Sequence, residues 1–562
     1  MGELTPASST GLWIALDYVA LVLTLAGCYA LSRSSRVADS IWAALRYAGA
    51  HRGLVVVSAG LVAGLVAVTL SSARTPVPLI QDELSYLLAA DTFAQGRVTN
   101  PTHPYWHHFE TFQVIHEPTY MSKYPPAQGL ALGLGQRLTG DPVVGVWLST
   151  ALAVAAVCWM LQGWVPGRWA LLGSLLLLAN VTVHITWGQT FWGGQMALLG
   201  GAMVYGALPR ILRGGGVPVT LALVTGVAIL ANSRPYEGLV VSLPAAVALL
   251  VWFVGRDRAA MKLAVARVVV PGCAVLAIVV MAMGYYNHRI TGDPWRMAYA
   301  VHEEAYDPAP LFLWGSQRPV PEYRHASIRD AYEWMNGYFN HERSRSVAEL
   351  GASRVVNAVA VAKRLLSPAL LLPLLAIPWA LRRRHMRWVA LAVGGNFLAL
   401  AVATWGGLSH YYAPSLALTW LLIVQGLRHL HLASINGRPF GRYLVLGLLA
   451  VQVVVFAAVS SAYVSRDLNY RPVAVHEPSE ARARIEDDLV SRPGKHLVMI
   501  RYDPDRELYF SWSANRADID AADVVWAQSM GEKKNRSLFD YFSDRKVWWL
   551  YHDGEDWEVS PD

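Results

Sequence analysis

The sequence predicts an all-α polytopic membrane protein with about twelve transmembrane helices, followed by a C-terminal α/β domain outside the membrane. Of 562 residues, 54% are hydrophobic and only 15% are charged, whereas soluble proteins carry about 25% charged residues. The 22 tryptophans suit a chain with two membrane–water interfaces to occupy. Apolar blocks of about twenty residues, the length that crosses a bilayer, recur along the chain.

These blocks are the predicted spans. Each is long enough to cross the hydrocarbon core when modest tilt is allowed. Cys28, Cys158 and Cys273 lie inside such blocks, so we interpret them as packing residues rather than as a disulfide or metal framework. The blocks are 11–31, 53–73, 142–163, 169–187, 192–212, 218–233, 237–254, 268–286, 366–381, 388–405, 411–427 and 442–462.

The connectors between spans indicate the orientation. Every second connector is short and basic, which places this set in the cytoplasm. The loops 74–141 and 287–365 and the tail from 466 are then expected on the opposite, extracytoplasmic side. The basic connectors carry Arg33, Arg36, Arg46 and Arg52, then Arg168, Arg210 and Arg213, then Arg256, Arg258, Lys262 and Arg267, then Arg382, Arg383, Arg384 and Arg387, and finally Arg428, Arg438 and Arg442.

Charge divides the chain into a membrane body, 1–465, and a tail, 466–562. The tail has 14 basic and 20 acidic residues, whereas the body has a net charge of +13. A basic membrane body with an acidic tail is not the pattern of a nucleic-acid binder. The tail shows no phosphate-binding loop, and we interpret it as a capping or acceptor-side domain. Its predicted elements are helices at 480–490 and 538–542 and strands at 496–502, 523–527 and 547–551.

The predicted spans contain almost no ionisable residues, with Asp17 and His184 as the main exceptions. Transporters usually place charged residues near the bilayer midplane, where an ion or substrate is coordinated. Here the polar residues gather at the outer ends of the spans instead. This distribution disfavours a transporter.

An acidic pair, Asp82-Glu83, follows the second span directly. A carboxylate at the edge of an apolar body can have its pKa tuned for a base, so Asp82 is a candidate to take a proton from a hydroxyl group. The alternative is a pair of acids at a helix N-terminus that complements the helix dipole. Both interpretations fit an amphipathic helix over 82–95 that lies along the membrane interface.

The same loop is rich in histidine, with four of the chain's 17 histidines between 103 and 116. Such side chains are ligand types for a divalent metal ion, although no zinc-type spacing is present. A solvated interfacial loop is the alternative. The candidate metal ligands are His107, His108, Glu110, His116 and Glu117.

Lys123 precedes Tyr124-Pro125-Pro126. We expect the two prolines to hold a rigid turn that fixes the cation near the membrane, at the level of a lipid phosphate.

The segment Asp82-Glu83-x-x-Tyr86, a short helix ending near Gly96, and Lys123-Tyr-Pro-Pro resemble the first outer loop of GT-C glycosyltransferases. The resemblance is to glycosyltransferase family 39, the protein O-mannosyltransferase and aminoarabinose-transferase branch. It covers this loop and, more loosely, the membrane body, but not the tail. It implies a polyprenyl-phosphate sugar donor, Asp82 as the base with Glu83 as its companion, and Lys123 as a phosphate contact. Tyr86 and Tyr124 of the same loop are candidate substrate contacts.

Further motifs lie at the outer rim. Arg234 is expected to bind phosphate beside Glu237, and the alternative is a snorkelling arginine that pairs with Glu237. A turn of aromatic and amide side chains suits a sugar ring, and a membrane-interface aromatic belt explains it equally well. The remaining candidate substrate contacts are Gln189, Trp192 and Gln195 in that turn, Glu237, His410 and Tyr411, and the remaining candidate phosphate contacts are His288 and Arg289.

The sequence therefore predicts a multi-pass protein of the cell (inner) membrane whose active site and tail lie outside the cytoplasm. The expected activity is inverting transfer of a sugar from a polyprenyl-phosphate donor to a hydroxyl of an envelope glycan, lipid or protein. A divalent metal ion is the one cofactor considered, and membrane lipids are expected partners. The alternative is a non-enzymatic transporter or a lipid-binding scaffold.

Overall fold

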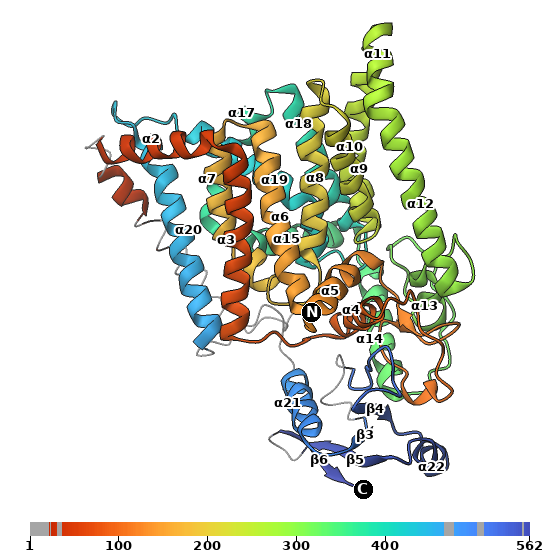
Figure 1. Cartoon of the computed structure of the whole chain (residues 1–562). Coiled ribbons are helices and arrows are strands. Elements are labelled where there is room, and N and C mark those ends of the chain that lie inside the picture. The colour runs from red at the N-terminus through yellow and green to blue at the C-terminus, as the bar shows by residue number, and fades with distance from the viewer. Residues whose placement is uncertain are drawn as a thin grey trace.

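A computed structural model describes residues 36–465, 477–502, 511–552 and 556–562, together with 19, 22 and 24–30. The predicted first span, 11–31, falls largely outside the described residues. The remaining apolar blocks form a bundle of upright helices (Figure 1). Its helices are α3 (Arg52–Ala73), α6 (Val143–Trp164), α7 (Gly167–Leu178), α8 (Gly194–Leu212), α9 (Val217–Ala231), α10 (Pro235–Val254), α11 (Arg258–Ala264), α12 (Val270–Thr291), α18 (Arg384–Ala401), α19 (Ala413–Leu430) and α20 (Phe440–Ser465).

The bundle confirms a multi-pass membrane protein, but it confirms the predicted number of spans only in part. In the described chain, five helices are long and apolar enough to cross a membrane, or six if one bent pair counts as a single span. α7 and α9 are shorter apolar helices. α8 and α19 lie in the middle of the bundle (Figure 1), and most of their residues are buried. A helix surrounded by protein does not need the apolar surface that lipid requires.

Close packing at the centre depends on glycine. A Cβ at Gly201 of α8 would lie 2.0 Å from the carbonyl oxygen of Pro414, the second residue of α19. Only a residue without a side chain therefore permits this approach of the two helices, as at small-residue contacts between membrane helices.

Two predicted spans are broken. The block 366–381 forms α16 (Pro368–Leu371), a 3₁₀ turn (Leu372–Ala376) and α17 (Ile377–Ala380). Pro373 and Pro378 lie in it, and proline has no N–H to donate to a continuous helix. The block 169–187 ends its α-helix at Leu178 and continues as a π-helical turn, Thr182–Thr186.

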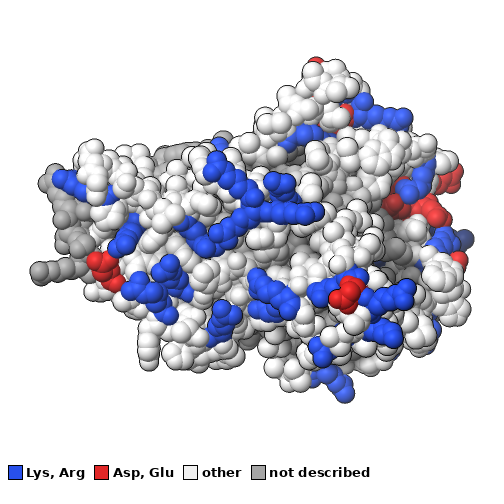
Figure 2. All heavy atoms as spheres, turned by 90° about the horizontal axis from the view of Figure 1, so that it is seen from above, with Lys and Arg blue, Asp and Glu red and all other residues white. Residues whose placement is uncertain are grey.

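The short connectors lie at one end of the bundle, which we call the connector face. α2 (Arg36–Ala50), predicted only as a basic connector, runs across this face (Figure 1). Seen from above, the connector face has many Lys and Arg side chains and few acidic ones (Figure 2). Exposed cations from separate connectors include Arg46, Arg213, Lys262 and Arg383. This clustering agrees with the alternation of basic connectors in the sequence.

The first loop and the first part of the second gather at the opposite end, which we call the loop end, whereas α15 (Val347–Leu365), the last helix of the second loop, lies at the level of the bundle helices (Figure 1). The first loop forms α4, a 3₁₀ turn, a two-stranded antiparallel sheet and α5, and the second forms three helices. The bounds are α4 (Gln81–Ala94), the 3₁₀ turn (Trp106–His108), β1 (Val114–Ile115), β2 (Met121–Ser122), α5 (Pro126–Thr139), α13 (Ala298–Tyr306), α14 (Ala326–Ser344) and α15 (Val347–Leu365).

The tail forms a small mixed sheet beneath the loop end (Figure 1). Its strand order is β4-β3-β5-β6, in which β3 pairs in parallel with β4 and β5, and β6 is antiparallel to β5. The predicted helices and strands are all present, and β6 is an addition. The bounds are α21 (Glu477–Ser491), β3 (Lys495–Ile500), β4 (Val524–Gln528), α22 (Glu532–Tyr541), β5 (Arg545–His552) and β6 (Trp557–Pro561).

The tail and the first loop bury their apolar side chains together. Leu84 of α4 packs in one cluster with Val498 and Trp526 of the tail, and Leu88 packs in a second with Leu497 and Met499. α4 is consequently buried on most of its surface, and does not lie with an open apolar face along the membrane as predicted. The division of the chain at 465/466 remains a prediction.

Candidate active site

The first turn of α4 places the acidic pair, Asp82 and Glu83, at the loop end of the bundle. Glu83 is fully buried, and its carboxylate accepts hydrogen bonds from the backbone N–H groups of Leu79 and Phe191, the latter at 2.7 Å. Burial raises the pKa of Glu83 to about 7, although these N–H groups oppose the shift and the nearby charge of Asp82 adds to it. Glu83 thus fastens the start of α4 to the segment before α8, and it is closed to a substrate.

Asp82 is the open member of the pair. It is partly exposed, and its Oδ2 accepts a hydrogen bond of 3.2 Å from Nε1 of Trp192. Burial raises the pKa of Tyr86 to about 12, and the charge of Asp82 contributes to this shift. The neighbouring Tyr124 has its pKa raised in the same two ways. One face of Asp82 is therefore held by an indole N–H, and aromatic side chains surround it.

These aromatic side chains come from distant parts of the chain. Tyr86 and Tyr124 are stacked, with ring centroids 4.6 Å apart. The ring of His410 lies 4.4 Å from Trp192 and 4.5 Å from Tyr411. The structure thus brings together residues from α4, the start of α5, the start of α8 and the 3₁₀ turn before α19.

Two cations lie against this aromatic group. The guanidinium of Arg234, the residue that precedes α10, is 4.7 Å from the ring centre of Tyr411. Within the described part of the chain, no ion pair joins Arg234 to Glu237, although the two interact electrostatically. The pairing that the snorkelling alternative requires is therefore not formed.

Lys123 is the second cation, and it is almost completely buried. Its Nζ lies 4.6 Å from the ring centre of Tyr299 and 5.5 Å from that of Tyr124. Burial lowers the pKa of this ammonium, and the charges of Asp307, Glu303 and Asp82 oppose the shift.

The prolines after Lys123 act differently from the prediction. Pro125 precedes α5 and Pro126 is its first residue, because the fixed φ of proline suits the first helical position and no N–H is needed there. They begin a helix rather than hold an isolated turn.

Three residues of the second loop at the site were missed in the sequence. Tyr299 and Glu303 are on α13, and Asp307 follows it directly. Burial raises the pKa of Asp307 to about 6, opposed mainly by Lys123. Glu303 forms an ion pair of 3.0 Å with Arg318. The helical spacing of Tyr299 and Glu303 was a readable signal of a shared face, but nothing local relates that face to Lys123.

Other predicted residues lie apart from this group or have structural partners. His288 and Arg289 are exposed at the end of α12, where they contact Gly292 and Tyr285 of their own helix end. Gln189 and Gln195 are buried, and their amides bond to Ser71 and to the Trp187 carbonyl respectively. Glu237 is buried in the first turn of α10, close enough to Arg234 to interact with its charge.

The predicted metal ligands are not gathered. Among the described residues, no group of three or more His, Cys, Asp or Glu side chains is placed to hold a metal ion. His108 Nδ1 bonds to the Gln528 carbonyl, His116 Nε2 accepts from the Thr111 N–H, and Glu110 binds Tyr306 and Arg324. His107 lies against Trp106, and Glu117 is exposed. The side chains that could bind a metal instead tie the loop to its surroundings.

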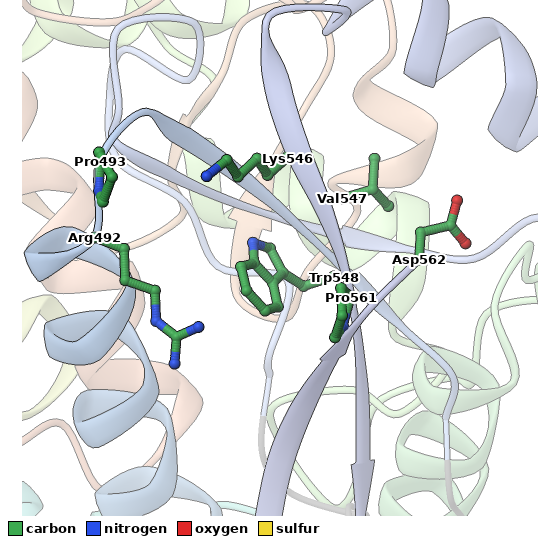
Figure 3. A pocket seen from close by; sticks show the side chains of 7 residues that line it. All are labelled: Arg492, Pro493, Lys546, Val547, Trp548, Pro561 and Asp562. Atoms are coloured by element: carbon green, nitrogen blue, oxygen red, sulfur yellow. The ribbon is translucent and has the colours of Figure 1, made fainter.

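One shallow pocket of about 510 Å³ lies on the tail, away from these residues (Figure 3). It is bounded by the end of α21, the start of β5 and the end of β6. Its lining residues are Arg492, Pro493, Lys546, Val547, Trp548, Pro561 and Asp562. None of the residues around Asp82 contributes to it.

No family model and no curated protein matches the chain. Among solved structures, ArnT from Cupriavidus metallidurans bound to undecaprenyl phosphate is 13% identical, over 89% of this chain and 96% of that one, with a TM-score of 0.49. The Archaeoglobus fulgidus oligosaccharyltransferase, tethered to an acceptor peptide, is 11% identical over 88% and 69%, with a TM-score of 0.48. At these identities and TM-scores the likenesses assign no family, activity or substrate to this chain.

Proposed function

We propose that this protein transfers a glycosyl group from a polyprenyl-phosphate donor to an acceptor hydroxyl at the extracytoplasmic face of the membrane. The observation that carries the proposal is the convergence of one open carboxylate, Asp82, with two cations, Lys123 and Arg234, around the stacked pair Tyr86 and Tyr124. A base, phosphate-binding cations and flat aromatic surfaces are the groups that such a transfer needs.

The chemistry follows from these groups. Asp82 accepts the proton of the acceptor hydroxyl, and the oxygen forms a bond to the anomeric carbon as the bond from that carbon to the phosphate oxygen breaks. The phosphate oxygen leaves with the electron pair, so the phosphate gains negative charge. A single displacement from the opposite side inverts the anomeric configuration.

The cations stabilise the leaving group. Lys123 and Arg234 are already in place before the charge develops, so they stabilise the transition state more than the bound donor. Glu83 has a positioning role, because its carboxylate is occupied by two backbone N–H groups and holds the start of α4, and thereby Asp82.

The donor is proposed to arrive through the bilayer. Nucleotide sugars are cytoplasmic, whereas the candidate groups lie at the loop end, opposite the connector face that the positive-inside rule places in the cytoplasm. A sugar carried on a membrane lipid reaches this end directly.

The test is release of polyprenyl phosphate from a panel of polyprenyl-phosphate sugars. Full-length protein in lipid vesicles is supplied with an envelope extract as the source of acceptor. We expect Asp82→Asn to lower turnover about 10²–10⁴-fold, the contribution of a positioned general base. Asp141→Asn is the matched control, because Asp141 is exposed in the turn between α5 and α6.

Two results would contradict the proposal. No release above protein-free vesicles with any donor would refute the transfer, and donor crossing the bilayer intact would favour the transporter alternative. Normal turnover of a folded Asp82→Asn variant would remove Asp82 as the base.

A further inference from the structure

Gln528, the last residue of β4, connects the tail to both long loops. Its side-chain Nε2 donates to the backbone carbonyl of Glu110 in the first loop at 2.9 Å. Its Oε1 accepts from Ser327 Oγ of the second loop at 3.1 Å. Its own carbonyl accepts from Nδ1 of His108, also at 3.1 Å. Nε2 also donates to Ser513 Oγ at 3.2 Å. The amide is nearly buried, so water does not readily replace the partners that are lost with this side chain.

Glu110 continues this path from the first loop to the second. Its carboxylate is buried, and Oε1 accepts from the hydroxyl of Tyr306 at 2.7 Å and from Arg324 at 3.2 Å. Its backbone carbonyl is held from the tail side by Ser513 Oγ at 2.9 Å, in addition to Gln528. The backbone of Glu110 is therefore fixed by the tail, and its side chain fixes Tyr306.

Tyr306 is the last residue of α13, the helix that reaches Lys123. Tyr299, Glu303 and Tyr306 are spaced by four and three residues, which places them on one face of the helix. Tyr299 lies against the Lys123 ammonium, and Glu303 interacts with its charge. Because α13 is only nine residues long, holding Tyr306 fixes the direction of this whole face.

We propose that the tail acts as a positioning element of the active site, and that Gln528, Glu110 and Tyr306 are the positioning residues that hold α13 against Lys123. The function of Lys123 as a phosphate contact rests on the transfer activity proposed above, but the mechanical link does not. The tail thereby supports donor binding through the second loop and is not itself a substrate-binding module.

The first experiment needs no activity. Hydrogen exchange of the full-length protein in nanodiscs compares the wild type with Gln528→Ala and Tyr306→Phe. We expect amide exchange over 298–306 to accelerate about tenfold in both, the scale of one lost buried hydrogen bond. Lys546→Ala is the control, because Lys546 lines the distant tail pocket (Figure 3) and is exposed.

Tyr306→Phe keeps this test decisive even if Gln528→Ala does not fold. It keeps the ring and removes only the hydroxyl that Glu110 accepts, so the tail sheet should exchange as in the wild type. Unchanged exchange over 298–306 in Tyr306→Phe would overturn the proposal. Faster exchange in Gln528→Ala that is confined to the tail strands would also overturn it.

The second experiment measures donor kinetics. For Tyr306→Phe we expect the KM for the polyprenyl-phosphate sugar to rise about five- to tenfold, with the acceptor KM unchanged. The alkaline limb of the pH–rate profile should move to lower pH, because displacement of α13 weakens the acidic groups that keep Lys123 protonated. The titratable groups facing Lys123 are Asp82, Tyr124, Tyr299, His302, Glu303 and Asp307.

Its outcomes separate the two proposals. A merely structural role for Tyr306 would lower the amount of folded protein without moving the pH limb, and would contradict positioning. Failure of the wild type to release polyprenyl phosphate from any donor would contradict the transfer, whereas the exchange experiment would still decide whether the tail positions α13.

Discussion

The two ends of the bundle carry charge in opposite ways. On the connector face, Arg213, Lys262 and Arg383 are exposed, and this face has many Lys and Arg side chains (Figure 2). At the loop end, Glu83, Lys123 and Asp307 are buried, and each has its own set of contacts. Exposed charges are screened by solvent and salt, so one can substitute for another, whereas a buried charge depends on specific neighbours. On the connector face the total charge therefore matters more than any one charged residue, whereas at the loop end each charged residue has its own effect.

The strongest test of this difference pairs one lysine from each end. Lys123→Ala should lower turnover by about 10²-fold or more, because it removes a preorganised electrostatic contact to the leaving phosphate. Lys262→Ala, on the exposed surface of α11, should leave turnover within about twofold. Initial rates at saturating donor measure both, and equal losses in the two variants would abolish the distinction.

A smaller effect separates charge from geometry at Arg234. Arg234→Ala should cost about 10²-fold in turnover, whereas Arg234→Lys should recover only part of it, because a point charge does not reproduce the planar guanidinium that lies over Tyr411. Arg383→Lys is the matched change on the connector face and should have no effect. A silent Arg234→Ala in folded protein would remove Arg234 from the site.

Stability should depend on pH through Glu83. Its pKa is raised from 4.5 to about 7 in the folded protein, so its neutral form is favoured there. Its contribution is fully present below pH 4.5 and is lost as pH rises towards 7, by on the order of 3 kcal/mol. Between pH 5 and 8 the Tm of the wild type should fall relative to that of Glu83→Gln, which stays neutral. Parallel curves in thermal scans of the two proteins would contradict the assignment.

The smallest effect on turnover is expected for cysteine variants that test which end of the bundle lies outside the cytoplasm. An exposed residue of the tail is suitable for labelling. Lys533→Cys should react with an impermeant maleimide in spheroplasts, and Arg383→Cys should react only after permeabilisation. Both are made in a background without Cys273, the exposed native cysteine. The reverse pattern would invert the orientation.

Features with a local cause were predictable from the sequence. α4 was predicted at 82–95 and found at Gln81–Ala94, because its apolar spacing and its acidic first turn are contained in the segment itself. The strands of the tail were found for the same reason, except β6, an edge strand of only five residues that ends in proline. The broken block 366–381 was missed because its apolar composition outweighed its internal prolines.

The candidate site was predictable only where a motif contained it. Asp82, Lys123 and Arg234 were found from short motifs, and their catalytic roles remain predictions. Asp307 lies 184 positions after Lys123, and its electrostatic interaction with that ammonium depends on how two loops fold against each other. The histidines of the first loop show the opposite case. Their number in a short segment made them candidate metal ligands, although without zinc-type spacing, whereas in the structure they contact the tail and the loop itself.

The shared packing of α4 and the tail also sets the order in which the protein can mature. Leu84 and Leu88 emerge from the ribosome roughly 400 residues before Leu497, Val498 and Trp526, with which they pack. During synthesis the helix that carries Asp82 has an uncovered apolar side, and non-local contacts of this kind form late. A nascent chain arrested before the tail cannot complete this cluster, so the candidate site is complete only after nearly the whole chain has been translated.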